Sequence, residues 1–144
     1  MTELAQAVPG HLVRIAVNPV TEPFWAAARD ERLVAPRCGS CGQFRMPPTP
    51  FCPRCQSQSV DWIALSGAGT VFSYTVIRRS PFPNVDDFTY VPVVVELADA
   101  PGARLISNLV GVDLEEVAVG MAVQVAFGEI TDGWKVPLFR VASS

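Results

Sequence analysis

Histidine is almost absent from this sequence: His11 is the single one among 144 residues. Ser-His-Asp and Cys-His arrangements need an imidazole beside the nucleophile. His11 stands in the segment with the weakest pattern, so we expect it to be a solvated side chain. The Walker, dinucleotide-binding and His-Glu-x-x-His motifs are missing as well. The residues therefore offer little material for a catalytic site.

The chain also lacks the run of about 18 apolar residues that a membrane span needs. Its N-terminus does not show the basic and then apolar pattern of a secretory signal. We therefore expect no membrane association and a cytoplasmic location. In that reducing compartment, cysteines indicate thiolate ligands rather than disulfides.

Lysine is nearly absent, since ten of the eleven basic residues are arginine. The net charge is −3, and residues 61–144 carry ten acidic but only five basic side chains. An acidic C-terminal half, residues 61–144, would repel phosphate backbones, which disfavours nucleic acid as a partner. The 49% hydrophobic content exceeds what a self-sufficient soluble domain needs, so part of the apolar surface is expected to meet a partner.

Four cysteines are present, as two Cys-x-x-Cys pairs separated by ten residues: Cys38 with Cys41, and Cys52 with Cys55. Each pair can present two sulfurs from a tight turn, and two turns complete a tetrahedron around one ion. Four thiolates favour zinc, while a rubredoxin-like iron site and disulfides are the alternatives. A closed shell leaves no position for water, so we expect a structural zinc.

The pattern divides the chain into a tail or linker over 1–18, an N-terminal helix with the zinc ribbon over 19–65, and a barrel over 66–144. Thr21 is a candidate cap for a helix with Pro23 in its first turn. Short strands are expected at 33–37 and 44–46, leading into and out of the first cysteine pair.

Five β-rich runs follow, with one short helical segment at 113–117 between the third and the fourth. The runs cover 70–77, 91–97, 104–109, 122–127 and 134–141. Five strands with a helical insertion after the third is the plan of the OB-fold. The predicted fold class is therefore mainly β, with an N-terminal helix and four-cysteine zinc ribbon followed by a five-stranded OB-fold barrel. Gly67-Ala68-Gly69 indicates a kink where a barrel strand coils.

The loop 81–90 carries aromatic residues and the paired carboxylates Asp86 and Asp87. Such a pair could do acid-base work if buried, but in a loop it is more often solvated. Arg78 and Arg79 could meet the phosphates of a cofactor. Consecutive strand residues face opposite sides, so at most one of the two reaches a given groove. The loop fits an interface anchor as well as a ligand site.

Several stretches in chain order carry a family resemblance: Pro23-Phe24-Trp25, Leu33-Val34, Arg37-Cys38, Phe51 to Cys55, Gly67 to Val76, Tyr90-Val91-Pro92 and Gly120-Met121. On these motifs the chain resembles the acyl-CoA-associated OB-fold proteins with a rubredoxin-like zinc ribbon, known as the domain of unknown function 35 family. The resemblance covers most of the chain.

The resemblance implies a non-catalytic accessory subunit in a hetero-oligomer. Its partner would be a thiolase-like aldolase of the lipid-transfer-protein type that acts on acyl-CoA thioesters, as in steroid side-chain degradation. A MaoC-type hydratase is a further implied partner, since related domains often follow one in the same chain. The resemblance also suggests Arg78, Arg79 and Phe82 as the lining of an acyl-CoA channel. Whether this chain is a stand-alone subunit or a piece of a longer protein stays open.

Two other functions compete with this one. A nucleic-acid-binding zinc-ribbon OB-fold protein would read bases with residues 91–95 and 104–106, which hold few stacking aromatics. A rubredoxin-like electron carrier would be red when purified.

Overall fold

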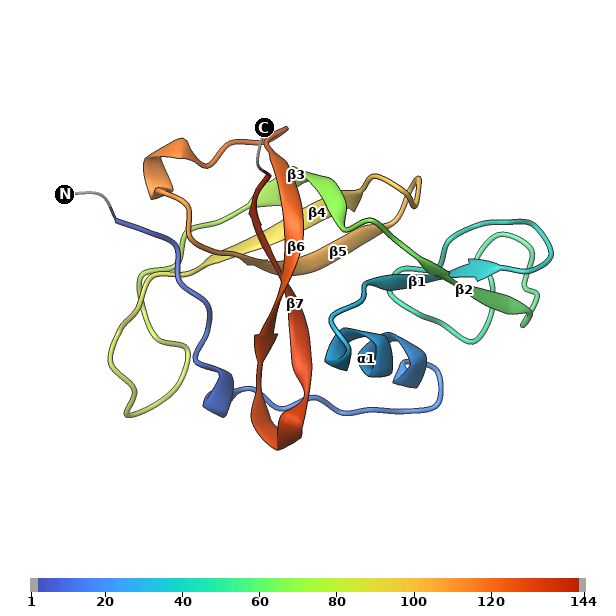
Figure 1. Ribbon diagram of the computed structural model, residues 1–144, viewed down its shortest axis with the longest axis horizontal. Coiled ribbons are helices and arrows are strands. Elements are labelled where there is room, and N and C mark those ends of the chain that lie inside the picture. The colour runs from blue at the N-terminus through green and yellow to red at the C-terminus, as the bar shows by residue number, and fades with distance from the viewer. Residues whose placement is uncertain (1–2, 143–144) are drawn as a thin grey trace.

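Alternating apolar residues build the wall of a closed β-barrel in the computed structural model, which describes residues 3–142. Its five strands are β3 (Ala68–Tyr74), β4 (Val91–Leu97), β5 (Arg104–Leu109), β6 (Ala122–Glu129) and β7 (Lys135–Val141). They pair in the order β3-β4-β5-β7-β6, and β3 also pairs with β6, so the sheet closes on itself (Figure 1). The 3-10 turn η2 (Leu114–Glu116) follows β5. The predicted OB-fold is confirmed.

The predicted strand limits are close to the observed ones. The runs 91–97 and 104–109 agree at both ends, and 122–127 extends two residues further. The first strand begins at Ala68 rather than at Thr70 and ends at Tyr74. A shift of register between Val71 and Ser73 marks a β-bulge there, which bends β3 around the barrel.

Gly69 allows β3 to pair on both of its edges. It lies opposite Leu97 of β4 and opposite Val123 of β6. A Cβ atom at this position would approach the carbonyl oxygen of Glu96 to 2.6 Å and a methyl group of Val95 to 2.5 Å. Gly67, two residues earlier, has a φ of +86°, which favours glycine. The predicted glycine kink is therefore the point at which the barrel closes.

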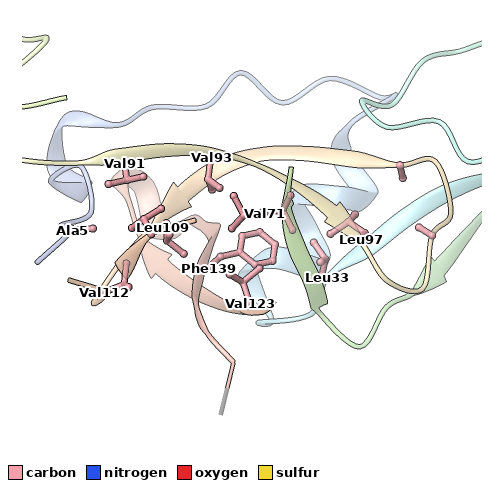
Figure 2. Close-up of a cluster of buried hydrophobic side chains, with 14 of the residues drawn as sticks. Ala5, Leu33, Val71, Val91, Val93, Leu97, Leu109, Val112, Val123 and Phe139 are labelled. Atoms are coloured by element: carbon pink, nitrogen blue, oxygen red, sulfur yellow. The ribbon is translucent and has the colours of Figure 1, made fainter. Parts of the chain in front are cut away.

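The barrel interior is filled by side chains from all five strands (Figure 2). Phe139 of β7 is fully buried at its centre and Leu109 of β5 lies beside it. β4 contributes every second residue, Val91, Val93, Val95 and Leu97, which is the period of a strand with one buried face. Burial of this set is the main source of the barrel's stability.

The N-terminal segment, for which the sequence predicts a tail or linker, lies along the barrel in its described part. Ala5 is buried, and its backbone N–H donates to the carbonyl of Val112 at 2.9 Å. The carboxylate of Glu3 accepts a hydrogen bond from the Thr89 hydroxyl at 2.6 Å and pairs with Arg78. The absence of a sequence period thus reflects an irregular backbone that nonetheless packs against the core.

Helix α1 (Glu22–Arg29) lies between the barrel and the cysteine-containing hairpin (Figure 1). Its buried residues are Phe24, Ala27 and Ala28, which pack toward the core. Thr21 occupies the N-cap position as predicted, but its side chain makes no capping hydrogen bond, so the predicted side-chain cap is wrong. The carbonyl of Asn18 accepts the N–H of Glu22 instead. None of the described helices is long and apolar enough to cross a membrane.

The ribbon is a hairpin of β1 (Val34–Cys38) and β2 (Val60–Ala64), paired antiparallel from Val34 opposite Ala64 to Cys38 opposite Val60. The sequence pattern predicts β1 but not β2. The strand expected at 44–46 is wrong: only Phe44 makes a β-bridge, to Arg37. Pro47, Pro48 and Pro50, which follow Met46, lack N–H donors and have fixed φ angles, which prevents a longer strand.

Phe139→Ala is expected to lower the free energy of unfolding by about 3–5 kcal/mol, because it opens a cavity in a closed core. Chemical denaturation monitored by far-UV circular dichroism measures this loss. Val141→Ala is the matched control, since Val141 lies on the same strand and is 46% exposed. Equal losses in both variants would contradict the central place given to Phe139.

Glu3 supplies a pH-dependent attachment of the N-terminal segment. The Thr89 hydroxyl and the Arg78 guanidinium hold the pKa of Glu3 below its usual 4.5. A carboxyl whose pKa is lower in the folded state stabilises that state above the unfolded pKa, and the stabilisation disappears as the pH falls through the folded value. At neutral pH, the wild type is therefore expected to have a higher free energy of unfolding than Glu3→Gln. This difference should vanish as the pH falls below 4.5. Denaturation of both proteins across this range checks it, and a difference independent of pH would argue against the carboxylate.

Candidate metal centre and apolar face

The four cysteine sulfurs converge at the end of the ribbon. All four lie within 4.8 Å of one another. The sulfur of Cys38 is 3.5 Å from that of Cys55, and the sulfur of Cys41 is 3.6 Å from that of Cys52. These separations are too long for S–S bonds, and the four cysteines are free. A tetrahedral zinc with Zn–S bonds of about 2.3 Å separates its sulfurs by about 3.8 Å, so the cluster fits the ion.

The two cysteine turns have the same local construction. In the first, the N–H of Gly42 donates to the carbonyl of Cys38, and in the second the N–H of Gln56 donates to the carbonyl of Cys52. Gly42 and Gln56 both adopt positive φ, at +80° and +64°. The left-handed residue turns the chain back, which leaves both sulfurs of a pair on the same side. This repeated turn is what the Cys-x-x-Cys spacing predicts.

Backbone donors prepare Cys38 for a metal. The N–H groups of Cys41 and Ser40 point at its sulfur from 3.5 and 3.4 Å. The Cys41 N–H in particular lowers the pKa of Cys38 to about 5, despite the burial of the sulfur. Thiolate is the ligand form of cysteine, so Cys38 is already in the form that binds zinc at neutral pH. Four thiolates around zinc form a closed structural site, in agreement with the prediction.

A second feature is an apolar face formed by α1, β4 and β5. Ile106 is 79% exposed, the largest exposure among the described large apolar side chains. Two hollows adjoin it, one of about 450 Å³ and one of about 530 Å³. Both are lined by Phe24, Trp25, Leu105 and Ile106. We call the surface made by these four residues and Val94 the Ile106 face.

The sequence itself carries a signal for this face. Along β5, Arg104 and Ile106 are exposed while Leu105 is half-buried and Leu109 is buried, so an isoleucine occupies an outward position. The helix that lies beside Ile106 is set by the tertiary structure. Trp25 of α1 is far from Ile106 in the sequence, yet it borders the same two hollows.

Arg78, Arg79 and Phe82, the predicted acyl-CoA contacts, lie elsewhere. Arg78 pairs with Glu3, Arg79 is exposed and Phe82 is half-buried. None of the three borders the hollows beside Ile106. Their role in ligand binding stays a prediction.

The loop 81–90 differs from the expected exposed aromatic anchor. Phe82, Phe88 and Tyr90 are all half-buried. The rings of Phe88 and Tyr90 stack on each other with centroids 5.2 Å apart. The backbone N–H of Ser80 donates to the carboxylate of Asp87 at 2.8 Å, while both acids of the Asp86-Asp87 pair are exposed. The most exposed of the described large apolar side chains, Ile106, therefore lies outside this loop.

A short helix and a four-cysteine ribbon, followed by a closed five-stranded barrel, define a zinc-ribbon OB-fold protein. Comparison with protein families gives two consecutive matches. Residues 25–61 match the family described as "ChsH2, rubredoxin-like zinc ribbon domain". Residues 62–128 match "ChsH2, C-terminal OB-fold domain". The chain belongs to this ChsH2/DUF35 family.

A solved structure described as "Ltp2-ChsH2(DUF35) aldolase" contains a similar chain. The TM-score is 0.80 at 36% sequence identity, and the match covers 90% of this chain and 100% of that one.

Two curated relatives are longer proteins. This chain is 37% identical over 129 residues to the probable enoyl-CoA hydratase alpha subunit of Thermomonospora curvata, a match that covers 90% of this chain and 40% of that subunit. It is 30% identical over 124 residues to the 3-oxo-4,17-pregnadiene-20-carboxyl-CoA hydratase alpha subunit of Mycobacterium tuberculosis, covering 86% of this chain and 39% of that subunit. The chain thus spans well under half the length of either relative.

Cys41→Ser is expected to abolish stoichiometric zinc and to open the ribbon, while most of the far-UV β signal of the barrel persists. Binding free energy at four-thiolate sites is about 10–16 kcal/mol in peptides, and a segment without a core of its own depends on it. Metal analysis and circular dichroism measure the two effects. Ser40→Ala, one residue away and not a ligand, is the control. A full zinc content in Cys41→Ser would refute the ligand assignment.

Proposed function

We propose that this chain is a non-catalytic accessory subunit of a thiolase-like aldolase that cleaves acyl-CoA thioesters. The observation that carries the proposal is the match to the ChsH2(DUF35) chain of an Ltp2 aldolase, which includes the whole of that chain. The partner would be an aldolase of the same lipid-transfer-protein type. The reaction would be a retro-aldol cleavage within the partner's own active site.

The chemistry of the chain supports an accessory role. His11 is exposed in the 3-10 turn η1 (Gly10–Leu12), where it borders neither hollow beside Ile106. The four cysteine sulfurs lie within reach of one ion, and a metal held by all four would have a closed shell. General acid-base or nucleophilic catalysis by this chain would need another pair of groups held within hydrogen-bond reach. The proposal assigns these groups to the partner.

The Ile106 face supports the presence of a partner. Ile106, 79% exposed beside two apolar hollows, leaves most of its side chain available for contact. Apolar residues at the centre of a protein interface, surrounded by groups that exclude water, carry most of its binding energy. Trp25, half-buried, packs edge-to-face against Phe24 at the same place, with ring centroids 4.9 Å apart. We propose that the aldolase docks on this face.

The names of two relatives support a class of substrate for the complex. The Mycobacterium tuberculosis relative is named for a steroid carboxyl-CoA thioester, and both longer relatives are named as hydratase subunits. We propose a steroid side-chain acyl-CoA as the substrate of the complex. A MaoC-type hydratase, which would deliver the hydroxyacyl-CoA that a retro-aldolase cleaves, is the proposed second partner.

Co-expression with lipid-transfer-protein thiolases of the same organism tests the assembly. The expected result is co-elution at fixed stoichiometry in size-exclusion chromatography with mass determination, and retro-aldol activity on an acyl-CoA in the complex only. Separate elution together with an active partner would overturn the proposal. A salt-dependent shift of an oligonucleotide by this chain would move the function to nucleic-acid binding.

Ile106→Asp is expected to weaken partner binding by at least about 2 kcal/mol, because a carboxylate would be buried in an apolar contact. Quantitative binding measurements with the purified aldolase check this. Val119→Asp is the matched control: Val119 is a similarly exposed aliphatic residue, at 68%, and borders neither hollow. Both variants should retain normal zinc and thermal stability. Equal loss of binding in both would exclude the Ile106 face as the specific contact.

A further inference from the structure

Arg45 is the one arginine that the described structure buries, with 2% of its surface exposed. It follows Phe44 at the exit from the first cysteine turn, and its backbone N–H donates to the carbonyl of Pro36 at 2.8 Å. Arginine is almost never fully buried unless it is paired. Its charge therefore needs an explanation within the ribbon.

The guanidinium joins the two cysteine turns. One terminal nitrogen, Nη2, donates to the carbonyls of Ser57 at 2.8 Å and Ser59 at 2.7 Å. The Ser57 carbonyl also accepts the N–H of Cys52, and the Ser59 carbonyl also accepts the N–H of Gly39. Each of the two carbonyls is thus shared between Arg45 and one of the turns. The side chain is held at the point where both turns meet.

Carbonyl oxygens satisfy donors but do not neutralise a charge. Within residues 3–142 no carboxylate lies within 4.0 Å of the Arg45 guanidinium, and its Nε has no hydrogen-bond partner. An uncompensated charge in such a position costs several kcal/mol. The four-cysteine cluster is the group that would carry negative charge once it holds a metal, and its two turns share the Ser57 and Ser59 carbonyls with Arg45.

We infer that Arg45 is a positioning residue that compensates the charge of the metal centre. Four thiolates outweigh the charge of one Zn²⁺, so the closed centre is a net anion. The buried guanidinium offsets part of this charge and at the same time holds the carbonyls of both turns. Metal binding and the burial of Arg45 therefore stabilise each other, and both favour the closed ribbon. This inference is independent of the proposed partner.

Arg45→Gln and Arg45→Lys separate charge from hydrogen bonding, because glutamine keeps an N–H donor without the charge and lysine keeps the charge. Zinc affinity is measured in the full chain by competition with a chromogenic chelator. Arg45→Gln is expected to weaken zinc binding about 10- to 100-fold, the usual effect of losing a group behind a metal ligand. Arg45→Lys should retain most of the affinity. Arg37→Gln, an exposed arginine next to Cys38, is the control and should not change it.

Cobalt(II) substitution gives a second measurement, which would not change if Arg45 only supported the fold. Loss of a nearby positive charge raises the energy of the sulfur electrons, so the thiolate-to-cobalt charge-transfer band of Arg45→Gln should shift to longer wavelength, and that of Arg45→Lys should not. Saturating metal should close the Arg45→Gln ribbon by mass action. Equal loss of affinity in the glutamine and lysine variants, an unshifted band, or a ribbon that stays open in saturating metal would each overturn the inference.

Discussion

The closure of the barrel at Gly69 is the constraint on which the rest of the structure depends. At this residue β3 pairs with both β4 and β6, and there is no room for a side chain. The sheet closes on itself, with β5 and β7 joined at Leu109 and Phe139, and its interior becomes one apolar core around Phe139. The N-terminal segment and α1 both rest on the outside of this closed barrel.

The ribbon is held by different forces. Leu33 and Ala35 at its base belong to the same apolar cluster as the barrel, and the N–H of Leu65 donates to the carbonyl of Leu33. Its far end has few buried apolar side chains and depends on the four sulfurs and on Arg45. The ribbon thus combines a hydrophobic base with a tip that depends on the cysteine cluster. The Met46–Pro48 link between the two cysteine turns lines one of the hollows beside Ile106.

Two features of the structure are candidates for function: the four-cysteine cluster and the Ile106 face. The aromatic rings of the 81–90 loop are half-buried. The Ile106 face lies where α1 meets β4 and β5, and one of its hollows is also lined by Met46, Pro47 and Pro48. The shape of that hollow therefore depends on the helix, the ribbon link and the barrel together. The proposed accessory role would couple the zinc-dependent folding of the ribbon to this shape.

By itself, the sequence determined the metal ligands, the order of the elements and the OB-fold, because these follow from local rules. Cysteine spacing reports a turn, a strand has a period of two, and glycine marks positions that exclude a Cβ. It did not determine β2, since the hairpin partner of β1 lies beyond both cysteine turns and has no clear alternation.

The tertiary structure alone decided the packing of the N-terminal segment, the partial burial of the aromatic rings in the 81–90 loop and the burial of Arg45. It also decided that Trp25 and Ile106 meet across one face. Each of these features depends on contacts between residues far apart in the chain. No local sequence pattern encodes how such contacts bury a residue. A charged residue such as Arg45 is expected at the surface from its type, and only the convergence of two turns around it accounts for its place inside.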